Sequence, residues 1–514
     1  MRLRTGPKAR QFTFHGHPSV LVLPDDRPRN DRRCRVSKFD MRADVIFENF
    51  HRNPALLERG LGCYSLRMLD WIAGDFLGPH INVMAMTRYG KEPAQAEASF
   101  DSFFSSEKST RVRTDSSMAE LQPFLEQSIS LLHENFPESY VLCYQSSRQL
   151  EQLARRYPSI RMMNPPAAMS ELLNRKTWVR SRLKALGVPV IPGDEVHLAP
   201  DLFTGLVHRY GMPLVVSLDH SAAGSGVHLI ESEAQFRAVA AAHLGAPAAV
   251  MQFIDGKSMS LTGVRTRDYV ILGEPSLQVI GQPSLTNLSF GWCGNDFSGE
   301  HLTDHEVEQM RDIQTRIGEW LGELHVGGQK GFHSIFGVDY ISDGEQVYFT
   351  EINPRFLGTT ALVADRQQEM GKIPVSFFHL VPHLPDVYLD DEFVDDYNRR
   401  GDPLNVSQLC LHNVLGEDVV VESSIEPGRY IFDRGQLRFL GPAQKLADTE
   451  SYDEVVITGE IPVEGTHLLR NSDEICKVYT YRPVLGHDGR TLNWQAEELV
   501  KAIQNSFRLS PVRT

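Results

Sequence analysis

Residues 337–355 read GVDYISDGEQVYFTEINPR, and this stretch decides the fold. Two strand-like runs flank a turn that begins at Asp343, which predicts a β-hairpin. Side chains alternate between the two faces of a strand, so Glu351 and Asn353 share one face. Asp339 joins that face if the loop beginning at Asp343 has three or five residues, whereas a two-residue loop places it on the opposite face.

Two carboxylates and an amide oxygen on one face form a hard, oxygen-rich set of donors that suits Mg²⁺. Such a site keeps several waters and takes further ligands from nucleotide phosphates. A solvated sheet face with ordinary acids explains the hairpin equally well. The hairpin therefore predicts a magnesium site only in combination with other segments.

Two further segments could contact phosphate groups. Residues 221–227 read SAAGSGV, where glycines let backbone N–H groups approach an anion and the hydroxyls add donors. Alone, this loop is more simply explained as a hairpin turn, because it matches neither a Walker A nor a Rossmann fingerprint. Lys176 is expected inside a helix over residues 170–185, where a single lysine is usually solvated.

Composition limits the class of protein. The 514 residues suffice for about three or four domains, and 41% hydrophobic with 23% charged residues is typical of globular proteins. A net charge of −14 argues against nucleic-acid binding. No apolar run approaches the roughly 18 residues of a membrane-spanning helix, and no secretory signal is visible. The six cysteines form no C-x-x-C pair, so we expect reduced, mostly buried thiols in a cytoplasmic protein.

The pattern divides the chain into four regions. Residues 1–43 are expected to be a tail, and residues 44–170 a mixed α/β layer. Residues 171–390 hold the segments described above, with a lid at about residues 187–248. Residues 391–514 shift to alternating strand patterns and end in a helix.

Three elements are predicted with particular boundaries. An apolar run at residues 140–144 predicts a buried strand, followed by a crossover helix. Thr303 and Glu306 form a capping-box pattern at the start of a long helix. The final helix is expected over residues 496–507.

The order of the segments resembles the ATP-grasp superfamily over roughly residues 165–370. The matching pieces are Lys176, Gly187-Val188-Pro189, Pro213-Leu214-Val215-Val216 with the Ser/Gly loop, MQFIDG at 251–256, GVDY at 337–340 and EINPR at 351–355. The EINPR end is quite specific. The resemblance implies an α/β and α+β multidomain protein, with two α+β lobes around ATP, an N-terminal α/β pre-ATP-grasp domain and a β-rich C-terminal extension. The layout looks most like bacterial amino-acid and peptide ligases of peptide natural-product biosynthesis.

The resemblance also implies roles for individual residues. Asp339, Glu351 and Asn353 would bind Mg²⁺, and Arg355 would face a carboxylate or an acyl phosphate. Lys176 would contact the ATP phosphates, the lid would cover them, and the hinge would hold adenine through its backbone. The implied nucleotide-binding residues are Lys176, Ser217, Ser221, Gly224, Ser225, Gly226, Gln252, Phe253 and Ile254.

The sequence departs from the family pattern at two positions. Ser217 stands where the family usually has a second phosphate-binding lysine, and Ser258 replaces an acid that binds ribose. We expect Arg265 or Arg267, just downstream, to supply the missing positive charge. A solvated strand explains these two arginines equally well.

The implied activity is an ADP-forming ligase that joins a small-molecule carboxylate, such as an amino acid or a peptide, to an amine through an acyl phosphate. The alternatives are an ATP-binding protein with lost catalysis and a kinase on the same scaffold. Neither nucleic acid nor membrane is expected as a partner, while a homodimer and docking of a carrier protein stay open. Residues 282–298 either line a substrate pocket or form an ordinary loop.

Overall fold

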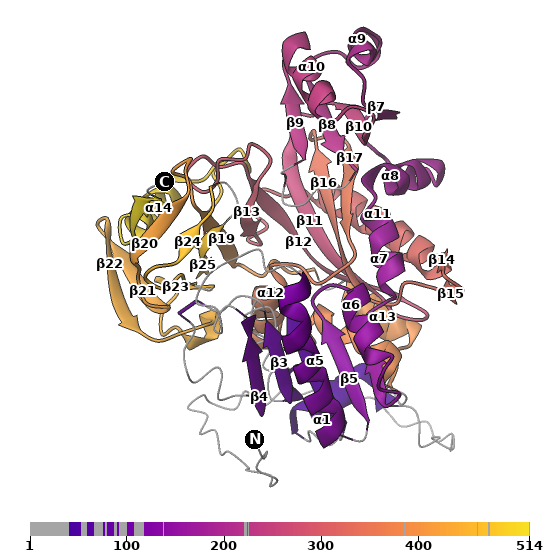
Figure 1. Cartoon of the computed structure of the whole chain (residues 1–514), viewed down its shortest axis with the longest axis vertical. Coiled ribbons are helices and arrows are strands. Elements are labelled where there is room, and N and C mark those ends of the chain that lie inside the picture. Colours follow the sequence, from indigo (N-terminus) through magenta and orange to yellow (C-terminus); the bar gives the residue numbers. More distant parts are fainter. Residues whose placement is uncertain are drawn as a thin grey trace, which may run out of the picture.

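A computed structural model of the chain describes residues 41–52, 59–65, 76–77, 80–86, 90–91, 100–106, 118–136, 138–219, 224, 226–384, 387–399, 401–459, 461–470 and 473–512. Figure 1 shows an α/β layer at one end, a large sheet in the middle and a lid that projects from the other end. The predicted tail ends earlier than residue 43. Strand β1 (Met41–Arg42) already pairs with β18 (Val387–Tyr388), and α1 (Ala43–Arg52) follows directly.

The N-terminal layer is a five-stranded parallel sheet. Its strands lie in the order β4 (Ser102–Ser105), β3 (Val83–Met86), β2 (Gly60–Ser65), β5 (Ser139–Cys143) and β6 (Ile160–Met162). Helices α5 (Met118–Asn135) and α6 (Arg148–Ala154) contribute to the core on one face, which confirms the predicted strand and crossover helix. The strand order reverses between β2 and β5, so their carboxyl ends form the switch point where α/β sheets usually bind ligands.

The lid is a separate four-stranded antiparallel sheet. Its strands lie in the order β7 (Gly193–His197), β10 (Pro247–Gln252), β8 (Leu214–Leu218) and β9 (Val227–Ile230). Helices α9 (Phe203–Tyr210) and α10 (Glu233–Ala242) cover one face and form a small core with Leu206, Phe236 and Val216. Because side chains alternate along β8, Ser217 lies on the face opposite α9 and α10.

A ten-stranded antiparallel sheet forms the body. Its order is β17 (Val347–Asn353), β16 (Ile335–Ser342), β11 (Lys257–Arg265), β12 (Val270–Ile280), β13 (Trp292–Asp296), β19 (Ser407–His412), β25 (Glu474–Thr480), β23 (Glu454–Thr458), β21 (Gly428–Asp433) and β22 (Gln436–Gly441). Strand β13 pairs directly with β19. Five strands beyond residue 391 (β19, β25, β23, β21 and β22) therefore continue the body sheet, whereas β20 (Val419–Ser423), β24 (His467–Leu468) and β26 (Arg508–Pro511) form a separate three-stranded sheet.

Helix α11 (Asp304–Glu323) packs on one face of the body sheet through Met310, Ile313 and Ile317. Its predicted capping box is present, since Thr303 accepts from the N–H of Glu306 and the Glu306 carboxylate accepts from the N–H of Thr303. This cap fixes where the helix begins.

The remaining elements are short or peripheral. They are β14 (His325–Val326), β15 (Gln329–Lys330), α12 (Thr360–Glu369), α13 (Asp391–Arg399), β20 (Val419–Ser423), β24 (His467–Leu468), α14 (Trp494–Gln504), β26 (Arg508–Pro511) and the 3₁₀ helices at Pro200–Leu202, Val375–His379, Val381–His383 and Leu446–Asp448. The five cysteines of the described residues are buried and free. Within the described part of the chain, no helix combines the length and apolarity needed to cross a bilayer.

The helix predicted over residues 170–185 is two helices, α7 (Ala167–Leu173) and α8 (Lys176–Ala185). The break falls at Asn174, which caps α7, and at Arg175, whose extended backbone (φ −82°, ψ 95°) starts the next helix. The prediction of one continuous helix was wrong.

Lys176 is consequently the first residue of α8 and does not lie inside a helix. Asp219, at the end of lid strand β8, accepts hydrogen bonds from the N–H (2.8 Å) and the hydroxyl (2.7 Å) of Thr177. A carboxylate in this position satisfies an otherwise unpaired N–H of the first helical turn. The lid therefore supplies the cap that fixes the start of α8.

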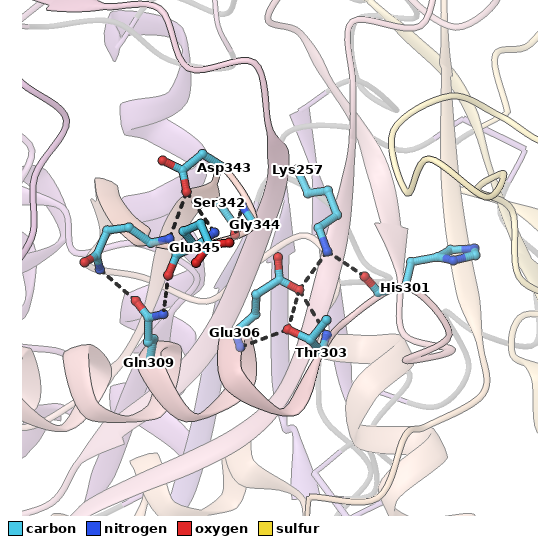
Figure 2. A network of polar contacts seen from close by, with 10 residues as sticks. Lys257, His301, Thr303, Glu306, Gln309, Ser342, Asp343, Gly344 and Glu345 are labelled. Carbon is cyan, nitrogen blue, oxygen red and sulfur yellow. Dashed lines mark hydrogen bonds and ion pairs between the residues drawn. The ribbon is translucent and has the colours of Figure 1, made fainter.

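Figure 2 shows how β11 is fastened to α11 just beyond the hinge between lid and body. The Lys257 ammonium donates to the Glu306 carboxylate (2.7 Å) and to the carbonyl of His301 (2.9 Å). Glu306 is only 1% exposed, so this ion pair is shielded from solvent. The first residue of β11 is thus held against the N-terminal end of α11.

The same helix holds the tip of the β16–β17 hairpin (Figure 2). Gln309, one turn further along α11, accepts from the N–H of Val347 (2.9 Å) and donates to the carbonyl of Glu345 (3.0 Å). Inside the loop, the Asp343 carboxylate accepts from the N–H groups of Glu345 and Gln346. These contacts fix the hairpin that carries the candidate site.

Candidate functional site

The β16–β17 hairpin brings Asp339 and Glu351 opposite each other. The loop has four residues (343–346), and an even loop alone would place Asp339 opposite Thr350. A bulge between Asp339 and Tyr340 shifts the register by one residue and restores the pairing with Glu351. Neither the two-residue loop nor the odd loop considered from the sequence is present, and the bulge produces the shared face instead.

Asn353 lies on the same face, opposite Gly337, and its Nδ2 donates to Asp339 Oδ2 (2.9 Å). Gln278, on β12, donates through Nε2 to Asp339 Oδ1 (3.0 Å). Burial, followed by the nearby Glu351 carboxylate, raises the pKa of Asp339 to about 6. The structure therefore gathers two carboxylates and two amides at one place on the sheet.

Lys176 reaches this cluster from the start of α8. Its ammonium lies 3.0 Å from Glu351 Oε2, and its side chain is only 10% exposed. The lysine is thus held next to the paired carboxylates, although it belongs to a distant part of the sequence.

Arg355 lies two residues beyond Asn353. Its guanidinium donates to Asn353 Oδ1 (3.0 Å), to the carbonyl of Phe356 (3.0 Å) and to the hydroxyl of Tyr144 (3.2 Å). Within the part of the chain that the structure describes, Arg355 forms no ion pair with a carboxylate. Neutral oxygens fix its direction, and its positive charge lies close enough to Asp339 to oppose the rise in the pKa of that carboxyl.

The donor chemistry of this cluster fits Mg²⁺. Two facing carboxylates and an adjacent amide oxygen are hard ligands, and Mg²⁺ needs only one or two protein carboxylates when phosphates and waters complete its shell. Groups of three or more His, Cys, Asp or Glu side chains that could hold a metal are absent from the described residues. With two carboxylates and one amide, Asp339, Glu351 and Asn353 suit a metal that arrives with a nucleotide better than a closed structural site.

The lid loop lies against the body. Gly224 has a φ of +80°, and a Cβ atom there would come within 2.2 Å of the carbonyl oxygen of Phe290. Leu218 donates its N–H to the carbonyl of Gly226, which closes the base of the loop. Ser221 and Ser225 lie outside the described residues. Residues 282–298 thus include the body segment that the lid contacts.

The expected hinge residues Gln252, Phe253 and Ile254 connect the lid strand β10 to β11. The N–H of Gln252 donates to Pro192, and that of Phe253 donates to Pro213. These two N–H groups already donate hydrogen bonds within the protein. An adenine bound here would therefore use other backbone groups of the hinge.

Arg265 does not fit its expected role. It lies on the α11 face of the sheet, against Gly322, whereas Asp339 points to the opposite face. Burial lowers the pKa of Arg265, and the acids Asp268, Glu319 and Glu323 act against this shift. Arg267 is turned away too, because its guanidinium donates to the carbonyl of Pro382. We correct the expectation accordingly and leave both arginines out of the candidate site.

Sequence reasoning missed three residues that organise the site. Gln278 contacts Asp339 from another strand, and no local motif announces such a pairing. Tyr144 is the last residue of the strand predicted at residues 140–144, and the carboxyl end of a parallel strand was a usable signal. Asp219 caps α8 from the lid, which only the break between α7 and α8 makes necessary.

Parts of the sequence match known proteins. Residues 182–359 match the family model of the ATP-grasp domain. The chain is 25% identical over 183 residues to the arginine-specific large chain of carbamoyl phosphate synthase from Geobacillus stearothermophilus, covering 35% of this chain and 16% of that protein. It is 22% identical over 222 residues to the butirosin acyl-carrier protein–L-glutamate ligase of Niallia circulans, covering 42% of this chain and 51% of the relative.

A solved structure extends the likeness to most of the chain. The biotin carboxylase domain of 2-oxoglutarate carboxylase from Hydrogenobacter thermophilus superposes with a TM-score of 0.55 at 13% identity, covering 88% of this chain and 91% of the other. The chain contains an ATP-grasp domain and has the ATP-grasp fold. It spans only 16% and 51% of the two curated relatives named above.

Proposed function

We propose that the protein is an ADP-forming ligase that joins a carboxylate to an amine through an acyl phosphate. One observation carries the proposal: Asp339 and Glu351 face each other next to Lys176, beside an arginine that forms no ion pair with a carboxylate of the described residues. This arrangement supplies a metal site, a phosphate-binding cation and an anion-binding guanidinium within one cluster.

The residues would divide the work as follows. Asp339, Glu351 and Asn353 would hold Mg²⁺, which supplies charge neutralisation on the nucleotide phosphates. Lys176 would bind phosphate oxygens from the start of α8. Arg355 would orient the carboxylate and stabilise the negative charge that develops during phosphoryl transfer.

A carboxylate is a poor electrophile at neutral pH, so it first needs a leaving group. Its oxygen would attack the γ-phosphorus of ATP, releasing ADP and forming an acyl phosphate. The amine would then attack the acyl carbon, and inorganic phosphate would leave. The lid loop around Gly224, which lies against Phe290, would keep water away from the acyl phosphate.

The relatives support this chemistry and suggest which substrates to test. The Niallia circulans relative is named for joining L-glutamate to an acyl-carrier protein, and the Hydrogenobacter thermophilus structure contains MgADP and bicarbonate. We propose small carboxylates, including amino acids and peptides, as the first substrates to test. We also propose that the protein is cytoplasmic. Bicarbonate and carrier proteins belong in the same test. The Hydrogenobacter thermophilus structure is a dimer, so we propose a homodimer for this protein too.

The test is a screen of carboxylates and amines for ADP release, followed by mass spectrometry of the products. Hydroxylamine is added in parallel, because it converts an acyl phosphate into a stable hydroxamate. We expect ADP release that depends on one carboxylate, and a hydroxamate when the amine is omitted.

Glu351→Gln is the loss-of-function variant and Glu345→Gln is its control, since Glu345 is an exposed acid on the same hairpin. Activity should survive only in the control. A stable phosphate ester as product, or ADP release that needs no carboxylate, would contradict the proposal.

A further inference from the structure

Arg355, the proposed catalytic arginine, contacts Tyr144, a residue of the N-terminal layer. Tyr144 directly follows β5 of the N-terminal sheet, at its carboxyl end. Its hydroxyl accepts a hydrogen bond from Arg355 Nη1 (3.2 Å), and the guanidinium carbon lies 5.7 Å from the centre of its ring. A cation near an aromatic ring is attracted by the ring's negative face.

The backbone at the same position reinforces the contact. The carbonyl of Tyr144 accepts from the N–H of Phe356 (3.1 Å), the residue after Arg355. The N–H of Tyr144 in turn donates to the carbonyl of Tyr64, at the end of neighbouring strand β2. The loop that carries Arg355 is therefore attached to the switch point of the parallel sheet, through both side chain and backbone.

The other partners of Arg355 leave its orientation dependent on Tyr144. Asn353 ends β17 and Phe356 directly follows Arg355, so both of these partners are neighbours of the arginine in sequence. Tyr144 is the contact that ties the guanidinium to a different element. All three acceptors are neutral, so they fix its direction without neutralising its charge.

We propose that Tyr144 is a positioning residue that aims Arg355 at the anionic substrate, and that the N-terminal layer thereby forms part of the active site. This inference rests on the proposed function of Arg355. Without the hydroxyl, the guanidinium keeps its charge but samples more orientations, so phosphoryl transfer slows while nucleotide binding is unaffected.

The chain offers a matched control on the same strand. Tyr140 also accepts a hydrogen bond from an arginine, Arg59 Nη1 (2.6 Å), with the guanidinium carbon 5.6 Å from its ring centre. This second tyrosine–arginine pair lies at the other end of β5, away from Arg355. Tyr140→Phe removes a comparable hydrogen bond without touching the candidate site.

The test compares the kinetics of Tyr144→Phe and Tyr140→Phe, with the affinity for MgADP measured separately. We expect Tyr144→Phe to lower kcat by roughly 5- to 20-fold, because a hydrogen bond to a charged group is lost, with the KM for ATP and the affinity for MgADP unchanged. Tyr140→Phe should match the wild type. Equal losses in both variants, or an unchanged kcat in Tyr144→Phe, would overturn the proposal.

A double-mutant cycle identifies Arg355 as the residue through which Tyr144 acts. In an Arg355→Lys background, Tyr144→Phe should have little further effect, because lysine does not depend on the same aligned fork. A full, additive loss would overturn the proposal.

Failure of the proposed function would look different. If the wild type consumes no carboxylate, the ligase assignment fails, and crystal structures of the wild type and Tyr144→Phe still test the positioning. The arginine should change orientation only in that variant, and an unmoved side chain would overturn the inference.

Discussion

The two middle strands of the lid sheet, on the face opposite α9 and α10, differ in charge from the face of the body sheet that carries Asp339. On the lid, the middle strands present Val215, Ser217 and Ala249, which are small or neutral. On the body, Asp339 and Glu351 face each other, with Lys176 and Arg355 beside them. The two cations beside the carboxylates therefore come from α8 and from the segment after β17, and neither middle strand of the lid carries one. The replacement of the usual lid lysine by Ser217 is consistent with this division.

The largest effect should come from the body carboxylates. Asp339→Asn and Glu351→Gln should each reduce ADP release by about 100-fold or more, since a lost metal ligand weakens charge neutralisation directly. Steady-state kinetics with saturating ATP measures this.

Asp339→Asn should lower the activity without lowering the stability of the folded protein. Folding raises the pKa of Asp339 from its ordinary value to about 6, so the ionised carboxyl destabilises the native state near pH 7. Asp339→Asn should therefore melt at the wild-type temperature or above. A variant that melts well below the wild type would show that its lost activity reflects misfolding.

The lid should be most sensitive at Gly224. Gly224→Ala adds a Cβ that would meet the Phe290 carbonyl at 2.2 Å, so the lid should fail to close and kcat should fall by roughly 30-fold. Gly245→Ala is the control, because it has a similar φ (+76°) with nothing within 4 Å. Equal losses in both variants would indicate backbone strain and not blocked closure.

As the pH falls below 6.5, the body should lose more folding stability than the lid. Burial lowers the pKa of His379 to about 3 and of His383 to about 4, both below the ordinary value of 6.5. The unfolded state then binds more protons between these values, so stability is full above pH 6.5 and falls as the pH drops towards 4. At pH 5.5, the protonation of each histidine in the unfolded state should lower the free energy of unfolding by about 1.4 kcal/mol.

Hydrogen exchange at pH 7.5 and 5.5 checks this comparison. Protection should fall more in β16, where the N–H of Ile335 donates to His379, than in lid strand β8. Equal losses in the two strands would contradict the account.

The smallest effect is expected where lid and α8 meet. Asp219→Asn weakens the cap of α8 and with it the position of Lys176, so the KM for ATP should rise by about 5-fold while kcat changes little. Ser232→Ala removes a comparable cap from α10, far from the candidate site, and should leave the KM unchanged. A similar KM in Asp219→Asn and the wild type would contradict the coupling.

The sequence predicted the features that depend on local patterns. The hairpin, the capping box at Thr303 and Glu306 and strand β5 follow from periodicity and short-range chemistry, and the structure confirms them. The ATP-grasp resemblance rested on the order of motifs, which is also readable from the chain.

Features set by distant contacts were not predictable in the same way. The bulge beside Asp339 reversed the parity argument from loop length, and Asp219 split one expected helix into two. Arg265 was expected near the phosphates because it is close in sequence, yet the alternation along β11 turns it to the α11 face. The merging of the C-terminal strands into the body sheet depends on the pairing of β13 with β19, which no local pattern encodes.

The most direct test of the account is calorimetric titration of ADP into the wild type and into Glu351→Gln, each with and without Mg²⁺. We predict that Mg²⁺ tightens ADP binding by about tenfold or more in the wild type and not in the variant, because Asp339, Glu351 and Asn353 would hold an ion that neutralises the phosphates. An equal Mg²⁺ effect in both proteins, or none in the wild type, would contradict a metal–nucleotide site at Asp339, Glu351 and Asn353.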